Sequence, residues 1–285
     1  MHTGVFTFST DRDMSPARFA REVEDRGFAE LMFTEHSHIP VSRETAYPDV
    51  YGGGVLPDFY QRTYDPFVAC SFAAAATTTL RIGTGVCLLA LRDPVHAAKE
   101  VASVDHLSGG RFVFGVGFGW NADEFRTHGV PFDRRHAIVE EKIGLMRALW
   151  TQDEASFTGE HVQLEPSWAW PKPVQQPGPP VYVGGNGPRS MRHAARWGDG
   201  WFPTSMAGYP SPADAVRRFH ELVEQAGRDP RTVSVGVAPA GVDEAQLAAY
   251  AEAGLDRVDV ICMGASDADL LGSLDALAKV RDSVL

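Results

Sequence analysis

A histidine beside a glutamate is the pair in this chain best suited to proton transfer. Glu35 and His36 directly follow an apolar run, residues 29–34, which is predicted to form a strand. Histidine has an ordinary pKa close to neutrality, so it can donate or accept a proton under physiological conditions. We predict that His36 is the catalytic acid or base and that Glu35 helps to orient it. A purely structural histidine is the competing interpretation.

Other classes of active site find little support. His38 forms a His-x-His pair with His36, which is a possible zinc arrangement, but the other predicted strand ends offer Gly, Phe, Trp and Pro instead of further ligands. Glycoside hydrolysis needs two facing carboxylates, and an α/β-hydrolase needs a G-x-S-x-G turn. The predicted strand ends supply no such carboxylate pair, and the chain has no such turn. We predict no metal centre and no hydrolase site.

Glycines stand at three further strand ends where reactive side chains would be expected. The segments are Gly85-Val86, Gly117-Phe118-Gly119-Trp120 and Gly184-Gly185-Asn186. Because glycine lacks a Cβ, a ligand or another chain segment can approach its backbone closely. The third segment leads into Pro188, which suits the first position of a helix, so free N–H groups there are predicted to bind a phosphate. An ordinary tight turn is the alternative for this segment alone. Together the three segments favour a broad, flat ligand that carries a phosphate, as a flavin does.

Short apolar runs alternate with segments of helical periodicity along the chain. The predicted strands are residues 5–8, 29–34, 82–88, 111–116, 181–183, 200–202, 233–237 and 257–261. Helix starts are marked by Ser15-Pro16, Asp65-Pro66 and Asp93-Pro94, in each of which a capping side chain precedes proline. Eight strands, each followed by a helix, predict an α/β fold, a (β/α)8 TIM barrel, as a single domain over residues 1–285. An open doubly wound sheet is the alternative.

Two long segments interrupt this alternation. Residues 37–63 are rich in glycine and aromatic side chains, and residues 151–180 are rich in proline and contain Trp168 and Trp170. Long segments of this kind in a compact domain are usually functional loops or disordered linkers. Because of their aromatic content, we predict that both are lids inserted at the C-terminal face of the barrel, where such barrels place their active sites.

Composition and charge limit the partners. The hydrophobic fraction of 44% and the charged fraction of 22% are those of a soluble globular protein. No apolar run approaches the ~20 residues that span a membrane, and no signal peptide is visible. The formal net charge of −11 argues against nucleic acid. Cys70, Cys87 and Cys262 lie far apart in apolar runs and are predicted to be buried thiols. We expect a cytoplasmic protein that acts on a small molecule, with no membrane partner.

Taken in order, these segments resemble the bacterial luciferase-like flavin and deazaflavin oxidoreductases. The matching stretches are residues 28–36, 65–69, 79–86, 108–120 and 181–203, so the resemblance covers nearly the whole chain. It implies the barrel already predicted, and it implies a homodimer because the family is usually dimeric. Gly85-Val86 matches the family's non-prolyl cis peptide, which supports the cofactor ring. Gly117 to Trp120 would line the ring's other side, and Gly184-Gly185, with Asn186 beside them, would receive the phosphate.

The branch of the family is indicated by two features. The chain ends its fourth strand in Gly117-Phe118-Gly119-Trp120 and carries Glu35-His36 instead of a doubled histidine, which looks most like the branch that uses coenzyme F420. This resemblance implies hydride transfer between the deazaflavin and an organic substrate, with His36 in the acid/base role. The apolar residues Phe118, Trp120, Trp201 and Phe202 favour a partly apolar substrate.

Alternatives and departures accompany that assignment. An FMNH2-dependent monooxygenase, which would need a separate cofactor-reducing enzyme, and a non-catalytic flavin-binding protein are the alternatives. The sugar-phosphate dehydrogenases of the family carry Trp and Glu where this chain has Pro40 and Trp120, so glucose 6-phosphate oxidation is not expected. Candidate cations for the negative tail of F420 are Arg43, Arg62, Arg92 and Arg189.

Overall fold

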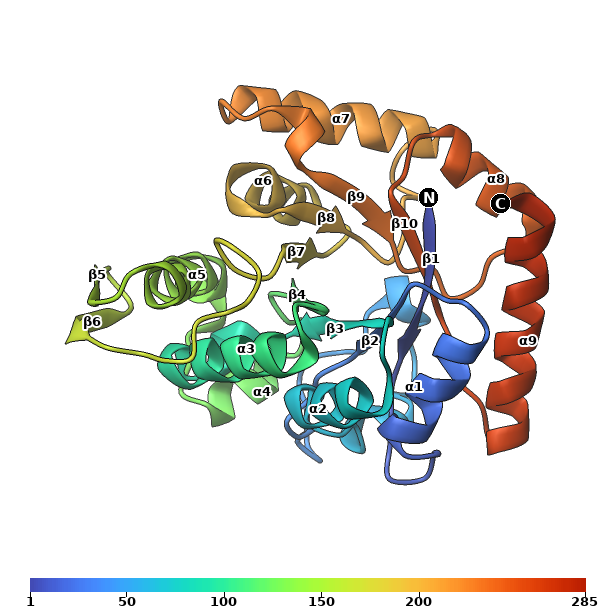
Figure 1. Cartoon of the computed structure of the whole chain (residues 1–285), viewed down its shortest axis with the longest axis horizontal. Helices are drawn as coiled ribbons and strands as arrows, with labels where there is room; N and C mark the ends of the chain where they lie inside the picture. The colour runs from blue at the N-terminus through green and yellow to red at the C-terminus, as the bar shows by residue number, and fades with distance from the viewer.

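Eight parallel strands close into a barrel, which confirms the predicted fold and excludes the open sheet (Figure 1). The computed structural model describes residues 1–285, apart from the side chain of Val50. Around the barrel the strands follow the order β1 (His2–Thr7), β2 (Glu30–Phe33), β3 (Arg81–Cys87), β4 (Phe112–Val116), β7 (Val181–Gly184), β8 (Gly200–Phe202), β9 (Ser234–Val237) and β10 (Arg257–Ile261). Parallel pairing of β10 with β1 closes the ring.

Helices surround this barrel and connect successive strands (Figure 1). They are α1 (Pro16–Asp25), α2 (Pro66–Ala76), α3 (Pro94–Ser108), α4 (Ala122–Thr127), α5 (Arg135–Thr151), α6 (Pro188–Trp197), α7 (Pro212–Gln225), α8 (Glu244–Glu252) and α9 (Asp267–Val284). The caps predicted for α1, α2 and α3 are present: Ser15, Asp65 and Asp93 each accept a backbone N–H of the first turn. In the part of the chain that the structure describes, no helix is long and apolar enough to cross a membrane.

The core has an outer and an inner part. A large apolar cluster fills the space between the strands and the helices. A smaller cluster lies inside the barrel and consists of Phe6, Met32, Val113, Tyr182, Phe202 and Ala238. All three cysteines are buried free thiols, as predicted, and burial raises the pKa of Cys262 to about 12. The inner cluster forms a solid floor beneath the C-terminal ends of the strands.

Residues 37–63 lie at those C-terminal ends. They contain two short 3-10 turns, Asp49–Tyr51 and Asp58–Gln61, and contribute aromatic side chains to the mouth of the barrel. The isolated bridge between Thr10 and Thr63 attaches the end of this segment to the loop that follows β1. This placement agrees with the prediction for the first long segment, and we call residues 37–63 the lid.

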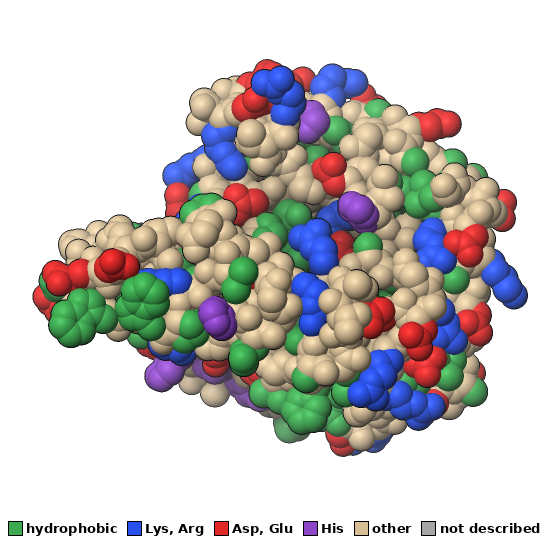
Figure 2. Space-filling model, in the orientation of Figure 1, with side chains coloured by type: hydrophobic (Ala, Val, Ile, Leu, Met, Phe, Trp, Pro, Cys, Tyr) green, Lys and Arg blue, Asp and Glu red, His purple; other side chains and the backbone are tan. Residues whose placement is uncertain are grey.

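The placement predicted for residues 151–180 is wrong. This segment follows a helix and precedes a strand, so it starts and ends at the N-terminal face of the barrel. It forms the hairpin of β5 (Ala155–Thr158) and β6 (Gln163–Ser167), which projects beside α5 (Figure 1). Lys172 donates to the Leu149 carbonyl at 2.7 Å, and Gln175 donates to the Phe112 carbonyl at 2.8 Å. Figure 2 shows hydrophobic side chains on this projection, where Trp168 is 79% exposed.

A carboxylate outside the active site is expected to stabilise the fold in a pH-dependent way. Glu24 accepts hydrogen bonds from the backbone N–H groups of Thr78, Thr79 and Leu80 before β3. Partial burial opposes its charged form, but these bonds lower the pKa of Glu24 to about 2. Its stabilisation is therefore complete above pH 4.5, the ordinary value, and is lost as the pH falls towards 2.

Replacing Glu24 with glutamine should lower the free energy of unfolding at pH 7 by about 1–3 kcal/mol, because backbone donors lose a charged acceptor. Urea unfolding at pH 7 and at several acidic pH values measures this effect. The difference between wild type and variant should shrink as the pH falls below 4.5. A difference that stays constant over this range would contradict the assignment.

Candidate active site

A cavity of about 750 Å³ lies at the C-terminal ends of the barrel strands and collects nearly all the residues predicted for the site. Those lining it are Glu35, His36, Gly85, Val86, Gly117, Phe118, Gly119, Trp120, Gly184 and Gly185. The lid adds aromatic side chains, namely Tyr47, Tyr51, Phe59 and Tyr60. A cavity of this size with largely apolar walls and a few polar groups is typical of cofactor and small-molecule sites.

His36 is held by a carboxylate that the sequence did not single out. Its Nδ1 lies 3.0 Å from both carboxylate oxygens of Glu124, which stands 88 residues further along the chain on α4. The side chains of His36 and Glu124 are 7% and 1% exposed. Because a carboxylate only accepts hydrogen bonds, Nδ1 is the donor, and the Nε2 nitrogen is left to exchange a proton. This arrangement suits a single oriented acid/base.

The predicted partner Glu35 does not orient His36. Its carboxylate accepts from the backbone N–H of Leu88 at 2.6 Å and from the Nε of Arg92 at 2.6 Å. Arg92 also pairs with Asp65 and Glu100, so it joins the ends of β2 and β3 to α2 and α3. Glu35 thus fixes the backbone that carries His36, and a catalytic role for its carboxylate finds no support in these contacts. Sequence adjacency misled here because Glu35 and His36 both lie beyond the end of β2 at Phe33, where the two side chains bind different partners.

The glycines at the strand ends make room for the side chain of Val86 as well as for a ligand. The Gly85-Val86 peptide bond is cis, as the resemblance implies. A Cβ added to Gly117 would lie 2.3 Å from Val86 Cγ2, and one added to Gly184 would lie 2.8 Å from Val86 Cγ1. The Val86 side chain therefore occupies the space above both glycines. A Cβ on Gly85 would meet the Phe6 ring at 2.6 Å.

The opposite end of the cavity is suited to an anion. Gly185 has a φ of 120°, which favours glycine, and it turns the chain from β7 towards α6. Ser190 on the first turn of α6 and Arg135 and His136 at the start of α5 line the same end. In the described part of the chain, Arg135 Nε and His136 Nδ1 are buried without a hydrogen-bond partner. The starts of α5 and α6 thus meet at this end of the cavity, and two side-chain nitrogens there have no hydrogen-bond partner among the residues described.

His136 is held as a neutral ring in this structure. It stacks on Phe118 with ring centroids 4.0 Å apart. Burial, and then the positive charges of Arg189 and Arg135, lower the pKa of His136 to about 3. Sequence reasoning missed Arg135 and His136 because they look like an ordinary helix start. Their only sequence signal is that they follow the glycine-rich end of the fourth strand, Gly117 to Trp120.

Asn186 and Arg92 bind other parts of the protein, whereas no described residue pairs with Arg189, which is free to bind a ligand's negative charge. Asn186 is not among the residues that line the cavity; its side-chain oxygen accepts from the Thr204 N–H at 2.8 Å and so joins two strand ends. Arg92 is bound by three carboxylates, as described above. Arg189 is exposed at the start of α6, and its positive charge helps to lower the pKa of His136. Arg189 therefore lies near the predicted phosphate end.

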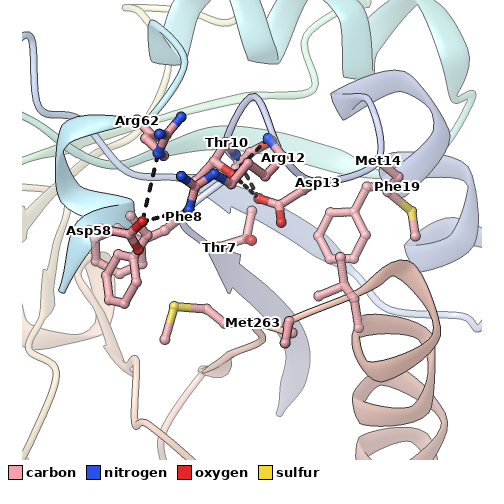
Figure 3. A pocket seen from close by; sticks show the side chains of 15 residues that line it. Thr7, Phe8, Thr10, Arg12, Asp13, Met14, Phe19, Asp58, Arg62 and Met263 are labelled. Atoms are coloured by element: carbon pink, nitrogen blue, oxygen red, sulfur yellow. Dashed lines mark hydrogen bonds and ion pairs between the residues drawn. The ribbon is translucent and has the colours of Figure 1, made fainter.

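A second, smaller hollow of about 320 Å³ adjoins the mouth and shares Phe8, Phe59 and Met263 with the main cavity (Figure 3). Its two arginines are already paired. Arg12 bonds to Asp58 at 2.6 Å, and Arg62 bonds to Asp11 at 2.9 Å. Both arginines of this hollow thus have carboxylate partners, although Arg62 Nε, like Arg135 Nε in the main cavity, is buried without a hydrogen-bond partner in the part of the chain that the structure describes.

Comparison with known proteins agrees with this architecture. The family model described as luciferase-like monooxygenase matches residues 5–283. An uncharacterized protein of Mycobacterium tuberculosis is 43% identical over 264 residues, which cover 90% of each chain.

Two solved structures share the fold. The coenzyme F420 dependent tetrahydromethanopterin reductase of Methanopyrus kandleri is 16% identical, with a TM-score of 0.74 over 100% of this chain and 99% of its own. The oxygenating constituent of 3,6-diketocamphane monooxygenase from Pseudomonas putida, a type II Baeyer–Villiger monooxygenase in complex with FMN, is also 16% identical, with a TM-score of 0.73 and the same coverage. The match over nearly the full length shows that this chain belongs to the luciferase-like monooxygenase family.

Proposed function

We propose that this protein is an F420-dependent oxidoreductase that transfers a hydride between the deazaflavin and a partly apolar organic substrate. The observation that carries the proposal is a cavity with one oriented acid/base, His36, at one end and unpartnered donors at the other. The phosphate end continues to the exposed residues Gly187, Pro188 and Arg189. A cofactor whose chain continues beyond its phosphate, as that of F420 does, finds an exit and a cation there.

The residues present fit such a cofactor. Arg135 Nε and His136 Nδ1 are buried donors or acceptors that lack partners among the described residues, and leaving such groups unsatisfied costs free energy. A phosphate bound at Gly185 and Ser190 would satisfy them. Val86 and Trp120 would hold the ring system. When bound, the deazaflavin supplies or accepts the hydride, and the protein contributes binding, orientation and proton transfer.

The chain's own side chains have three tasks in this proposal. Glu124 keeps the proton on Nδ1 of His36, so Nε2 can pass a proton to or from the substrate. The lid places Tyr47 and Tyr60 over the mouth, which keeps water away from the reacting atoms. The aromatic rings around Trp120 favour an apolar substrate, and Tyr47 lies with its ring centroid 5.7 Å from that of Trp120.

An FMNH2-dependent monooxygenase is the second candidate. It is favoured by the family's description and by the similarity in fold to a monooxygenase in complex with FMN. The same donors at Arg135 and His136 would receive the phosphate of FMN. A non-catalytic flavin-binding protein is a weaker third candidate, because a storage site has no use for the buried His36–Glu124 pair.

Equilibrium titration separates these candidates. The purified protein is titrated with F420 and, separately, with FMN, and each is followed by fluorescence and by calorimetry. The proposal expects micromolar or tighter binding of F420 and clearly weaker binding of FMN. Micromolar FMN binding without measurable F420 binding would overturn it in favour of the monooxygenase.

Arg135 is expected to bind the phosphate and not the ring. Replacing Arg135 with glutamine should weaken F420 binding about 10- to 100-fold, because charge-assisted hydrogen bonds contribute about 1.5–3 kcal/mol. Binding of the deazaflavin fragment that lacks the phosphate and tail should be unchanged. Fluorescence titration of both ligands measures the difference. Equal losses for the two ligands would show that the variant disturbs the cavity generally and would refute the assignment.

We also propose a cytoplasmic homodimer whose reduced cofactor is regenerated by a separate enzyme. Helix α2 exposes Val68 and Phe72 by 54% and 58%, and these residues lie one turn apart on its outer face. Exposed apolar residues grouped in this way favour a protein interface. Phe72→Arg should convert the dimer to a monomer in size-exclusion chromatography with light scattering. An unchanged dimer mass would place the interface elsewhere.

A further inference from the structure

The lid is a loop whose two ends meet at His36. It begins directly after this residue and ends at Thr63, whose hydroxyl accepts from the His36 N–H at 3.3 Å and donates to the His36 carbonyl at 3.1 Å. His36 therefore joins the two ends of the lid through its backbone and lines the cavity with its side chain. Any displacement of the lid acts on the backbone that carries the imidazole.

The first third of the lid is attached at a second point. The backbone N–H groups of Glu44 and Thr45 donate to one carboxylate oxygen of Asp123, at 3.2 and 2.9 Å. Asp123 is 2% exposed and also pairs with Arg126. A buried carboxylate that loses backbone donors is costly, so these two bonds oppose opening of the lid.

The residue next to Asp123 is the carboxylate that holds the imidazole. Glu124 binds His36 Nδ1 with both oxygens at 3.0 Å, and it belongs to the same first turn of α4 as Asp123. Asn121 caps this turn by accepting the Asp123 N–H at 3.3 Å. The short helix α4 thus binds the lid through Asp123 and the catalytic histidine through the adjacent Glu124.

We propose that Asp123 is the latch of the lid and that Glu124 is the positioning residue of His36, so that α4 couples closure of the lid to orientation of the imidazole. Release of Glu44 and Thr45 leaves the Asp123 carboxylate short of donors, and α4 must then shift or admit water. Glu124 shares that turn, so its hold on His36 loosens at the same time. The catalytic meaning of this coupling rests on the proposed function; the coupling itself does not.

Hydrogen–deuterium exchange tests the latch in the protein without cofactor. Asp123→Ala should speed exchange of the backbone amides around Glu44 and Thr45 by about 10-fold or more, because local opening becomes easier. Glu124→Gln, which keeps the shape of the side chain and both bonds to Asp123, should speed exchange in the lid much less than Asp123→Ala does, because it reaches the lid only through the coupling. Glu44→Gln is the matched control, because it keeps the backbone donor and removes only an exposed ion pair to Arg126 at 3.8 Å, which contributes little.

Nitrogen-15 chemical shifts of the His36 ring test the coupling. Wild type should show the proton on Nδ1, and Glu124→Gln should give a mixture of the two neutral forms. Asp123→Ala should change the same shifts, although Asp123 does not touch His36. If Asp123→Ala fails to fold, Asp123→Asn, which keeps one acceptor oxygen, takes its place with a smaller expected change.

Two results would overturn the proposal. Unchanged exchange in the lid of Asp123→Ala would remove the latch, and unchanged His36 shifts in a variant whose lid opens would remove the coupling. Neither measurement uses a cofactor or a substrate. Failure to bind F420 would therefore refute the proposed function and leave this inference standing. Unchanged exchange in the lid of Asp123→Ala would refute this inference and leave the proposed function standing.

Discussion

Replacing His36 with alanine should lower turnover by about 10²- to 10⁴-fold, the range that a positioned general acid or base contributes. The expected rate is that of F420H2 oxidation by an acceptor that the wild type reduces. The physical reason is that Nε2 of His36 is the nitrogen left free by the bond from Nδ1 to Glu124. Cofactor affinity should change little, because the predicted phosphate contacts lie at the other end of the cavity.

A neighbouring histidine provides the control for that experiment. His38 does not line the cavity, and its Nδ1 shares a hydrogen bond with the Ser37 hydroxyl at 3.0 Å. His38→Ala should therefore keep near wild-type turnover. If His36→Ala binds cofactor and turns over normally, the proton-transfer role is wrong. If His38→Ala loses as much activity as His36→Ala, the loss reflects disturbance of the lid and says nothing about proton transfer.

The largest effect on stability is expected at a buried ion cluster beneath the cavity floor. Arg257, which is 3% exposed, pairs with Glu30 at 2.5 Å and with Asp259 at 2.8 Å. Its guanidinium also lies 4.4 Å from the ring centroid of Tyr182 and 4.8 Å from that of Phe202. Burial raises the pKa of Asp259 well above its ordinary value, while the attraction to Arg257 works in the opposite direction.

Arg257→Met should lower the free energy of unfolding by about 3–5 kcal/mol, because it leaves buried carboxylates without their cation. Urea unfolding at pH 7, with unchanged m-values, measures this change. A triple variant that also carries Glu30→Gln and Asp259→Leu should recover much of the loss, since removing all the charges relieves the desolvation cost. A loss below about 1 kcal/mol for the single variant would show that the cluster contributes little, against the penalty expected for an unpaired buried charge.

Local signals explain why so much of the fold is predictable from the sequence. Asp65-Pro66 and Asp93-Pro94 each combine a capping carboxylate with a proline that has no N–H to satisfy, so both helix starts lie where predicted. Some strand ends are equally local, because the apolar run stops at a polar residue or at glycine, as it does after Phe33, Val116 and Val183. The cavity follows from these starts and stops, since parallel strands bring their C-terminal ends together.

What the sequence did not reveal depends on contacts between distant segments. The partner of His36 is Glu124, 88 residues away, and nothing in the local pattern distinguishes Glu124 from other charged residues on short helices. The filling of space above Gly117 by Val86 likewise requires the packing of two strands. α4 was not predicted because six residues are too few to show helical periodicity.

One error had a remedy within the sequence itself. Residues 151–180 were placed at the mouth because of Trp168 and Trp170, although they follow the helix that becomes α5 and precede the strand that becomes β7. In a barrel of alternating strands and helices, a connection from helix to strand lies at the N-terminal face. Connectivity was therefore stronger evidence than aromatic content.

A crystal structure of the protein with F420 bound tests the central claim most directly. The account predicts the deazaflavin ring between Val86 and Trp120, the phosphate at Gly185 and Ser190 with Arg135 beside it, and the reacting edge of the ring next to His36. Density for F420 confined to the smaller hollow beside Arg12 and Arg62, or a phosphate away from Gly185, would contradict it.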